Sequence, residues 1–100
     1  MSELKLHEVF CNILGNNNVY FQPPASVKMR YPAIVYSRKR IDNKHANNSV
    51  YMQSFGYEAT VIDYDPDSQY VLKMSQLPKC KWERNYVSDG LNHDVFTIFS

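Results

Sequence analysis

The sequence has 100 residues, of which 11 are Lys or Arg and 10 are Asp or Glu, so its formal net charge is +1. A chain of this length is expected to fold as a single domain over residues 1–100, with one modest hydrophobic core. The near-neutral charge argues against a protein whose overall field attracts nucleic acid. No apolar run approaches the ~20 residues that a membrane-spanning helix needs.

The composition is rich in aromatic residues, with eight Tyr, five Phe and one Trp. Tyr suits protein interfaces because it combines apolar area with a polar tip. Tyr is also common in β-strands, so both explanations of the surplus stay open. Cys11 and Cys80 follow no metal-binding or disulfide spacing, and two reduced thiols are the simpler expectation.

The first segment predicts a helix over residues 2–14. Ser2 is a candidate N-cap, and Gly15 suits the position after the last turn, where a positive φ is common. Apolar residues recur in this segment at helical spacing, so one face of the helix is expected to pack on a sheet. These residues are Leu6, Val9, Phe10, Ile13 and Leu14. Residues 19–22 are expected to form a short extended segment, which ends at Pro23-Pro24.

A second strand is expected after Pro32, over Ala33 to Arg40, because apolar residues alternate there. The following segment, Ile41 to Ser49, is polar, rich in Asn and without periodicity. Since it lies between two expected strands, we predict that it forms the tip of a hairpin too long for a tight turn, and that this tip is mobile and solvated.

The stretch from Tyr51 to Pro78 predicts a long strand followed by a helix. In its first part, Tyr51, Phe55, Tyr57, Ala59 and Val61 alternate with Met52, Ser54, Gly56, Glu58, Thr60 and Ile62. This period of two predicts a strand inside a sheet, with one face covered by a helix. Asp65 is expected to be the helix N-cap and Pro66 its first residue. The helix stripe is Tyr70, Val71, Met74 and Leu77, and Pro78 is expected to end the helix.

A final hairpin is predicted from Lys79–Ser88 and Asn92–Phe99, joined at the turn dipeptide Asp89-Gly90. The expected order is therefore helix, strand, long hairpin, helix and hairpin. This order indicates an α+β fold, in which an antiparallel-rich mixed sheet has two helices packed on one face.

Catalytic and metal-binding patterns are weak in this sequence. His7 and Cys11 share a helix face, but a structural zinc site needs four ligands. His93 is next to Asp94 in the sequence, and a His flanked by a carboxylate can act as a general base. However, no Ser or Cys lies in a sequence context that marks it as a catalytic nucleophile. The acidic run Asp63, Asp65 and Asp67 lacks the Gly and Glu of a calcium-binding EF-hand loop. We therefore expect no enzyme activity, no cofactor and no metal.

One segment concentrates basic residues: Lys28, Arg30, Arg38, Lys39, Arg40 and Lys44, with Tyr31 and Tyr36 between them. Such a pattern is compatible with a nucleic-acid surface. A solvated hairpin, or the rim of a protein contact, explains it better because the overall charge is only +1.

The sequence resembles the small neck proteins of long-tailed phages that infect Gram-positive bacteria, described as tail completion, tail terminator or minor capsid proteins. The likeness rests on Glu58–Pro78, on the run Tyr86–Thr97 and on the strand Pro32–Tyr36. It is a likeness of the whole pattern without a catalytic motif. The first helix and the basic segment carry little of it.

The resemblance implies a ring of identical subunits, commonly a hexamer, that caps the tail tube and meets the head-side stopper. DNA would pass through the ring without a specific binding site, and the protein would belong to the virion, assembled in the host cytoplasm. The alternatives are a head-side stopper or tube-like ring protein, a nucleic-acid-binding protein and, last, a small enzyme.

Two segments are more polar and aromatic than a monomer requires, and both are predicted to bind partners. The tip Arg38–Ser49 is expected to contact another ring, and the segment Tyr86–Asp94 to lie at a subunit boundary. The predicted contact residues are Arg38, Lys39, Arg40, Asp42, Lys44, His45, Asn47, Tyr86, Asp89 and Asn92.

Overall fold

The computed structural model describes residues 3–46 and 49–99, and the side chains of residues 3–4, 40–46 and 49–55 are outside this description. Its elements are α1 (Glu3–Leu14), β1 (Val19–Phe21), β2 (Ala33–Ala46), β3 (Ser49–Asp63), α2 (Gln69–Ser75), β4 (Cys80–Ser88) and β5 (Leu91–Phe99). Their order matches the predicted order of helix, strand, long hairpin, helix and hairpin.

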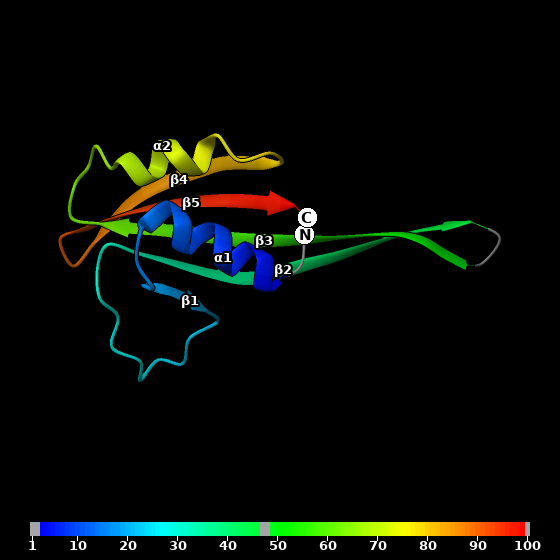
Figure 1. The fold of residues 1–100 in the computed structure, drawn as a ribbon, viewed down its shortest axis with the longest axis horizontal. Helices are drawn as coiled ribbons and strands as arrows, with labels where there is room; N and C mark the ends of the chain where they lie inside the picture. The colour runs from blue at the N-terminus through cyan, green and yellow to red at the C-terminus, as the bar shows by residue number, and fades with distance from the viewer. Residues whose placement is uncertain (1–2, 47–48, 100) are drawn as a thin grey trace.

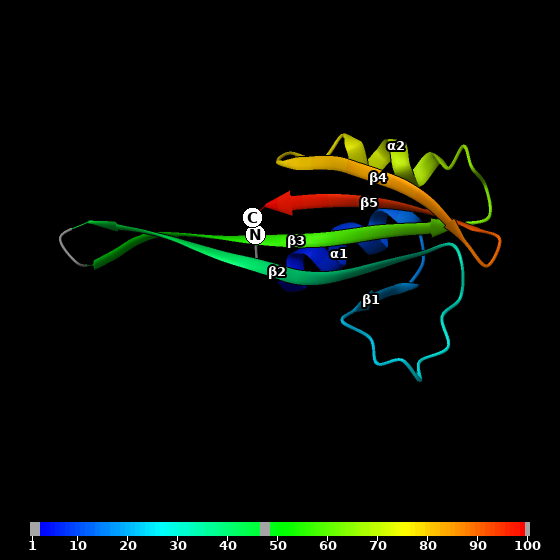
Figure 2. The same cartoon turned by 180° about the vertical axis from the view of Figure 1, so that it is seen from behind.

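The strands form one five-stranded sheet in the order β1-β2-β3-β5-β4. β1 runs parallel to β2, and the other neighbouring strands are antiparallel. The α+β class with an antiparallel-rich mixed sheet is therefore confirmed, and β3 lies inside the sheet as expected. Both helices lie in front of the sheet in Figure 1 and behind it in Figure 2.

The hydrophobic core lies between the helices and one face of the sheet. The pairing register aligns Tyr36 with Ala59 and Ala59 with Phe96, so their side chains share that face. The Phe10 ring of α1 meets the Tyr36 ring edge-on, with centroids 5.1 Å apart. The buried residues of this core are Leu6, Phe10, Leu14, Val19, Ile34, Tyr36, Tyr57, Ala59, Val61, Met74, Phe96 and Ile98. The set includes predicted inward residues of α1, α2 and β3, and the remaining residues of the two helix stripes are partly buried against it. The side chains of Tyr51 and Phe55, predicted for the same face of β3, lie outside the described residues.

The end of α1 confirms the role expected for Gly15. Its φ is +72°, and its N–H donates to the Cys11 carbonyl over 2.8 Å. A residue with a Cβ is strained in this conformation, so glycine is favoured there. The predicted N-cap, Ser2, lies outside the described residues.

The prediction of a long loop at Ile41–Ser49 is wrong. β2 and β3 remain paired from Ala33↔Ile62 to Ala46↔Ser49, so residues 41–46 form strand. An antiparallel ladder satisfies backbone N–H and C=O groups whatever the polarity of the side chains. Residues 41–46 lack the alternation of apolar and polar residues by which a half-buried strand is recognised in a sequence.

The predicted N-cap of α2 is also wrong. Ser68 precedes the helix, and its hydroxyl accepts a hydrogen bond from the Tyr70 N–H over 3.2 Å. Asp63 and Asp65 instead accept from the N–H groups of Asp65 and Asp67, over 3.2 and 2.8 Å. These two successive Asx turns form the connection after β3. The helix therefore starts later in the chain than predicted. Pro66 consequently lies in the turn and not in the first helical position.

The C-terminus of α2 comes earlier than predicted. The helix ends at Ser75 with Gln76 as its C-cap, so Pro78 lies beyond the end. The N–H groups of Gln76 and Leu77 donate to the carbonyls of Lys73 and Met74 over 3.3 and 3.1 Å. These shorter-range bonds tighten the final turn before β4.

Replacement of Ser68 by alanine is expected to lower the free energy of unfolding by about 1 kcal/mol, because the Tyr70 N–H loses its acceptor. Replacement of Asp65 by asparagine is the matched control, since the amide oxygen can still accept from Asp67. Urea unfolding measures both variants. Equal losses in the two variants would show that Ser68 is not the residue that caps α2.

Candidate functional site

The most prominent feature of the molecule is a two-stranded ribbon that extends beyond the rest of the sheet (Figure 1). β5 pairs with β3 only from Gly56 to Asp63, so in the described part of the chain residues 49–55 pair with β2 alone. We call residues 40–46 and 49–55 the arm. Its strand of residues 49–55 spans about 23 Å, and the molecule is 52 Å long and 29 Å wide.

The first predicted group of contact residues lies at the base of the arm and along it. Arg38 and Lys39 are exposed. The Arg38 guanidinium lies 5.7 Å from the centroid of the Tyr57 ring and donates to the Tyr57 hydroxyl over 3.5 Å, so this side chain also packs on the domain. The structure places Arg40, Asp42, Lys44 and His45 on the arm strand of β2, and Asn47 lies outside the described residues.

The second predicted group lies near the turn between β4 and β5, at the other end of the sheet from the arm (Figure 1). The Tyr86 ring, 44% exposed, stacks on the His93 ring with centroids 4.6 Å apart. Asp89 and Gly90 have φ values of +53° and +74°, as the predicted tight turn requires. Asn92 is half-buried at the start of β5. The structure therefore separates the two groups within one copy of the chain.

The outer strand of the sheet, β4, is a surface that the sequence did not single out. Its residues from Lys81 to Ser88 are all exposed, including Trp82 and Val87. The register shifts between Trp82 and Arg84, which indicates a β-bulge at Glu83. Bulges and charged side chains protect edge strands from uncontrolled pairing. No sequence signal could have identified this strand as the edge, because strand order depends on long-range pairing.

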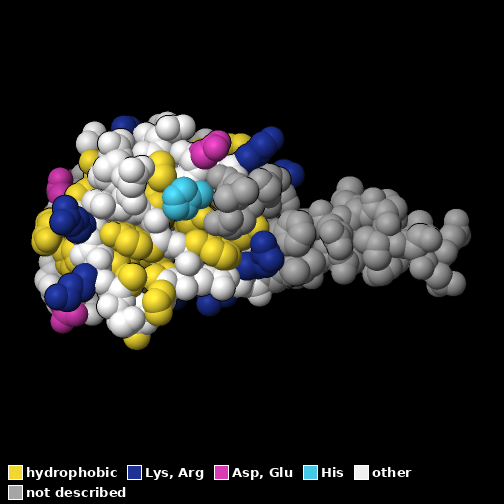
Figure 3. Space-filling model, turned by 60° about the horizontal axis from the view of Figure 1, so that its bottom comes forward, with side chains coloured by type: hydrophobic (Ala, Val, Ile, Leu, Met, Phe, Trp, Pro, Cys, Tyr) yellow, Lys and Arg dark blue, Asp and Glu magenta, His cyan; other side chains and the backbone are white. Residues whose placement is uncertain are grey.

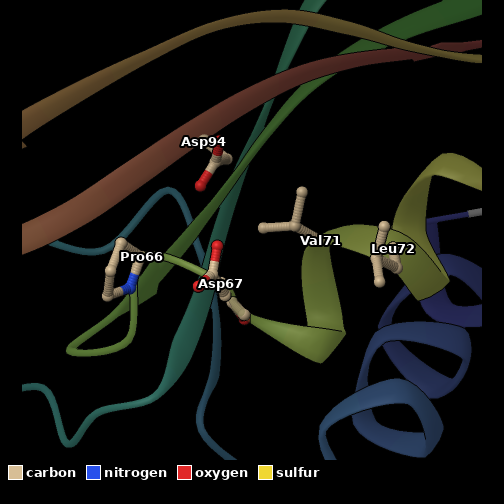
Figure 4. Close-up of a pocket in the computed structure, with 6 residues that line it drawn as sticks. Pro66, Asp67, Val71, Leu72 and Asp94 are labelled. Atoms are coloured by element: carbon tan, nitrogen blue, oxygen red, sulfur yellow. The ribbon is translucent and has the colours of Figure 1, made fainter.

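A pocket of about 210 Å³ lies between the β3–α2 connection, α2 and β5. It is lined by Pro66, Asp67, Ser68, Val71, Leu72 and Asp94 (Figure 4). Asp94 is buried, and its Oδ1 accepts a hydrogen bond from the Trp82 Nε1 over 3.1 Å. The sequence pairs Asp94 with His93 as a possible base, whereas in the structure Asp94 lines the same pocket as Asp67.

The candidate catalytic and metal-binding residues have other contacts. His7 Nδ1 lies 3.3 Å from the Tyr36 hydroxyl. His93 Nδ1 lies 3.0 Å from the Leu91 carbonyl oxygen. His93 and Asp94 are neighbours on a strand, so their side chains point to opposite faces of the sheet. Within residues 3–46 and 49–99, no cluster of three or more His, Cys, Asp or Glu could hold a metal ion.

The basic residues of the sequence come from several segments, and the side chains of Arg40 and Lys44 lie outside the described residues. Tyr36, expected between them, is buried against Phe10. Figure 3 shows the side of the molecule that carries α1 and β1, where the described Lys and Arg side chains lie apart from one another around exposed apolar groups. On this face the described Lys and Arg side chains therefore form no continuous basic patch.

Both cysteines are free thiols, and their surroundings make them poor nucleophiles. Burial raises the pKa of the Cys80 thiol to about 11. Burial, and secondarily the negative charge of Glu8, raises the pKa of the Cys11 thiol. Since the thiolate is the reactive form of cysteine, neither residue has the lowered pKa of an activated thiol.

Alkylation of Cys80 by iodoacetamide at pH 8 is expected to be roughly tenfold or more slower than that of free cysteine, because little thiolate forms below a pKa of about 11. The rate should continue to rise as the pH increases from 8 to 10. Mass spectrometry of the Cys80 peptide follows the reaction, with free cysteine as the control. A rate that levels off near pH 9 would contradict the raised pKa.

No helix in the described part of the chain is long and apolar enough to span a bilayer. The comparisons with known proteins leave the family of this chain open: no protein-family model matches it, and no curated protein matches it well enough to establish a relationship.

Proposed function

We propose that this protein is a structural virion protein of the phage neck, a ring-forming subunit that caps the tail tube and joins it to the head connector. The sequence resemblance to tail completion and terminator proteins supplies the biological context. The observation that carries the proposal is the arm, in which residues 49–55 of β3 pair only with β2 among the described residues.

An isolated two-stranded ribbon is marginally stable in water, so contacts with another molecule would stabilise the arm. The arm extends from one end of the sheet, and the β4–β5 turn lies at the other end (Figures 1 and 2). A contact between the arm of one copy and the opposite end of the next is heterologous. Repetition of such a contact gives a closed ring when the rotation between copies divides a full turn.

The exposed aromatic residues support the same proposal. Trp82 and Tyr86 on β4 are 49% and 44% exposed, and Val87 on the same strand is 64% exposed. Trp and Tyr are enriched in protein interfaces, where burial of their large apolar area stabilises association. The bulge within β4 interrupts the edge, which favours one defined partner over open-ended strand pairing.

A head-side stopper or a tube-like ring protein would use the same architecture, since small α+β ring subunits differ in their surfaces and not in their fold. The level of the protein in the neck distinguishes these positions. Density for this chain at the tail side of the neck, in electron cryo-microscopy of intact particles, would place it as the terminator. Density at the head side would place it as the stopper.

The experiment that tests the proposed function is omission of the protein during phage assembly. Particles made without it are expected to show filled heads separated from tails, and tails of irregular length, in electron micrographs. Supply of the intact protein in trans should restore joined particles. Virions of ordinary tail length and full infectivity without the protein would overturn the proposed function.

A further inference from the structure

The pocket beside α2 contains a buried carboxylate with an incomplete set of partners. Asp94 is 8% exposed, and the Trp82 Nε1–H donates to its Oδ1 over 3.1 Å. Among the described residues, no hydrogen bond to its Oδ2 is present. A buried carboxylate oxygen without a donor is costly, so this group favours a ligand that brings a donor or a positive charge.

A second carboxylate faces the first. Figure 4 shows the carboxylates of Asp94 and Asp67 directed toward one another across the pocket. Asp67 lies in the exposed connection before α2, and Asp94 lies on the buried face of β5. A cation bound between them would be attracted by both carboxylates.

The walls of the pocket indicate what kind of cation fits. Pro66, Val71 and Leu72 supply apolar surface beside the two carboxylates. A divalent metal ion prefers six or more oxygen ligands and gains little from apolar walls. A Lys or Arg side chain matches both parts, because its methylene stem packs on apolar surface while its charged end reaches a carboxylate.

The arm carries suitable side chains at the opposite end of the molecule. Its basic residues are Arg40 and Lys44, with His45 next to Lys44. The arm extends from one end of the sheet, whereas the connection between β3 and α2, which forms part of the pocket, lies at the other end (Figure 1). The arm therefore extends away from the pocket of its own copy, and a contact between an arm and a pocket would join two different copies.

We propose that the pocket formed by Asp67, Asp94 and the apolar wall of α2 binds the side chain of Arg40 or Lys44 from the arm of a neighbouring copy. This inference rests on the proposed ring function, and it names the contact that links one subunit to the next. It also assigns Trp82 a position next to the bound cation, through its hydrogen bond to Asp94.

Trp82 provides a direct reporter, because it is the single tryptophan of the chain. The test uses the full-length protein and a synthetic peptide with the sequence of residues 39–46. Addition of the peptide is expected to shift the NMR signal of the Trp82 indole N–H in a saturable manner. Peptides with Gln in place of Arg40 or Lys44 identify the side chain that binds, and a peptide with both replacements should give no shift.

Two variants of the protein show whether the carboxylates are responsible. Asp94→Asn and Asp67→Asn are each expected to weaken peptide binding at least tenfold. Glu8→Gln removes a negative charge from the exposed surface of α1 and should bind as the original protein does. Asp67 is exposed, so its replacement tests the pocket even if Asp94→Asn fails to fold. Unchanged binding by Asp67→Asn, or no shift with the original peptide, would overturn the proposal.

Two further outcomes would overturn the pocket contact in particular. Saturable binding of Ca²⁺ at the Trp82 signal, without a response to the peptide, would assign the pocket to a metal. Rings that assemble normally from Asp67→Asn would leave the ring function in place and remove this contact from it. Failure of the ring function has a different signature, namely complete virions without the protein.

Discussion

Replacement of Phe96 by alanine is expected to lower the free energy of unfolding by about 3–5 kcal/mol. Phe96 lies on β5 with no exposed surface, on the sheet face that both helices cover. Its register partner Ala59 has a small side chain, so the neighbouring strand cannot fill the space that the ring leaves. A domain of this size has a total stability of about 5–15 kcal/mol, so the variant should lose a large part of it.

Urea unfolding, followed by circular dichroism, measures this loss. Val87→Ala is the matched control, because Val87 is 64% exposed on the edge strand and its truncation removes little packing. We expect the control to change stability by about 0.5 kcal/mol or less. A loss below about 1 kcal/mol for the Phe96 variant would contradict the arrangement of helices over β5.

Shortening of the arm is expected to abolish assembly while the domain stays folded. Replacement of residues 42–54 by Asn-Gly leaves Ile41 and Phe55 as the last cross-strand pair, joined by a turn suited to a two-residue hairpin. The core residues lie outside the replaced segment, so unfolding of the isolated variant should remain cooperative. Head–tail joining should fall to the level found without the protein, because the neighbouring copy loses the arm it contacts.

Complementation of phage that lack the protein, read by infectious yield, measures this effect. The control variant carries Lys28→Ala and Arg30→Ala in the loop before β2, which removes basic charge without shortening the arm. This control should support joining. Normal yield with the shortened arm, from protein shown to be folded, would remove the arm from the mechanism.

Strands were predictable from the sequence where the apolar residues that form the core recur with a regular period. In β3, Tyr57, Ala59 and Val61 alternate with less apolar residues because one face of the strand covers the core, so that part of the strand was predictable. The arm strand of β2 has a polar sequence without this alternation, and the sequence therefore predicts a loop there. A strand is recognised in a sequence by the alternation that burial of one face requires. The backbone hydrogen bonds that define the strand form without such burial.

The helix cap illustrates a second limit. Asp65 and Ser68 are both good N-cap residues, and the sequence alone favours the one followed by Pro66. The successive Asx turns at Asp63 and Asp65 decide the outcome, because they extend the connection before the helix can start. The pocket was unpredictable for a related reason. Asp67 and Asp94 are far apart in the sequence, and only the placement of α2 against β5 brings them together.

Cross-linking between copies tests the head-to-tail contact most directly. The variant carries Asn43→Cys on the arm and Gln69→Cys at the start of α2, next to the contact but outside it, in a chain whose Cys11 and Cys80 are replaced by alanine, and the particles are treated with a bifunctional thiol reagent. We expect a ladder of covalent multimers on a denaturing gel that ends at one closed ring, while either single-cysteine variant gives no ladder. Bands that stop at the dimer, or monomers alone from joined particles, would contradict the head-to-tail contact.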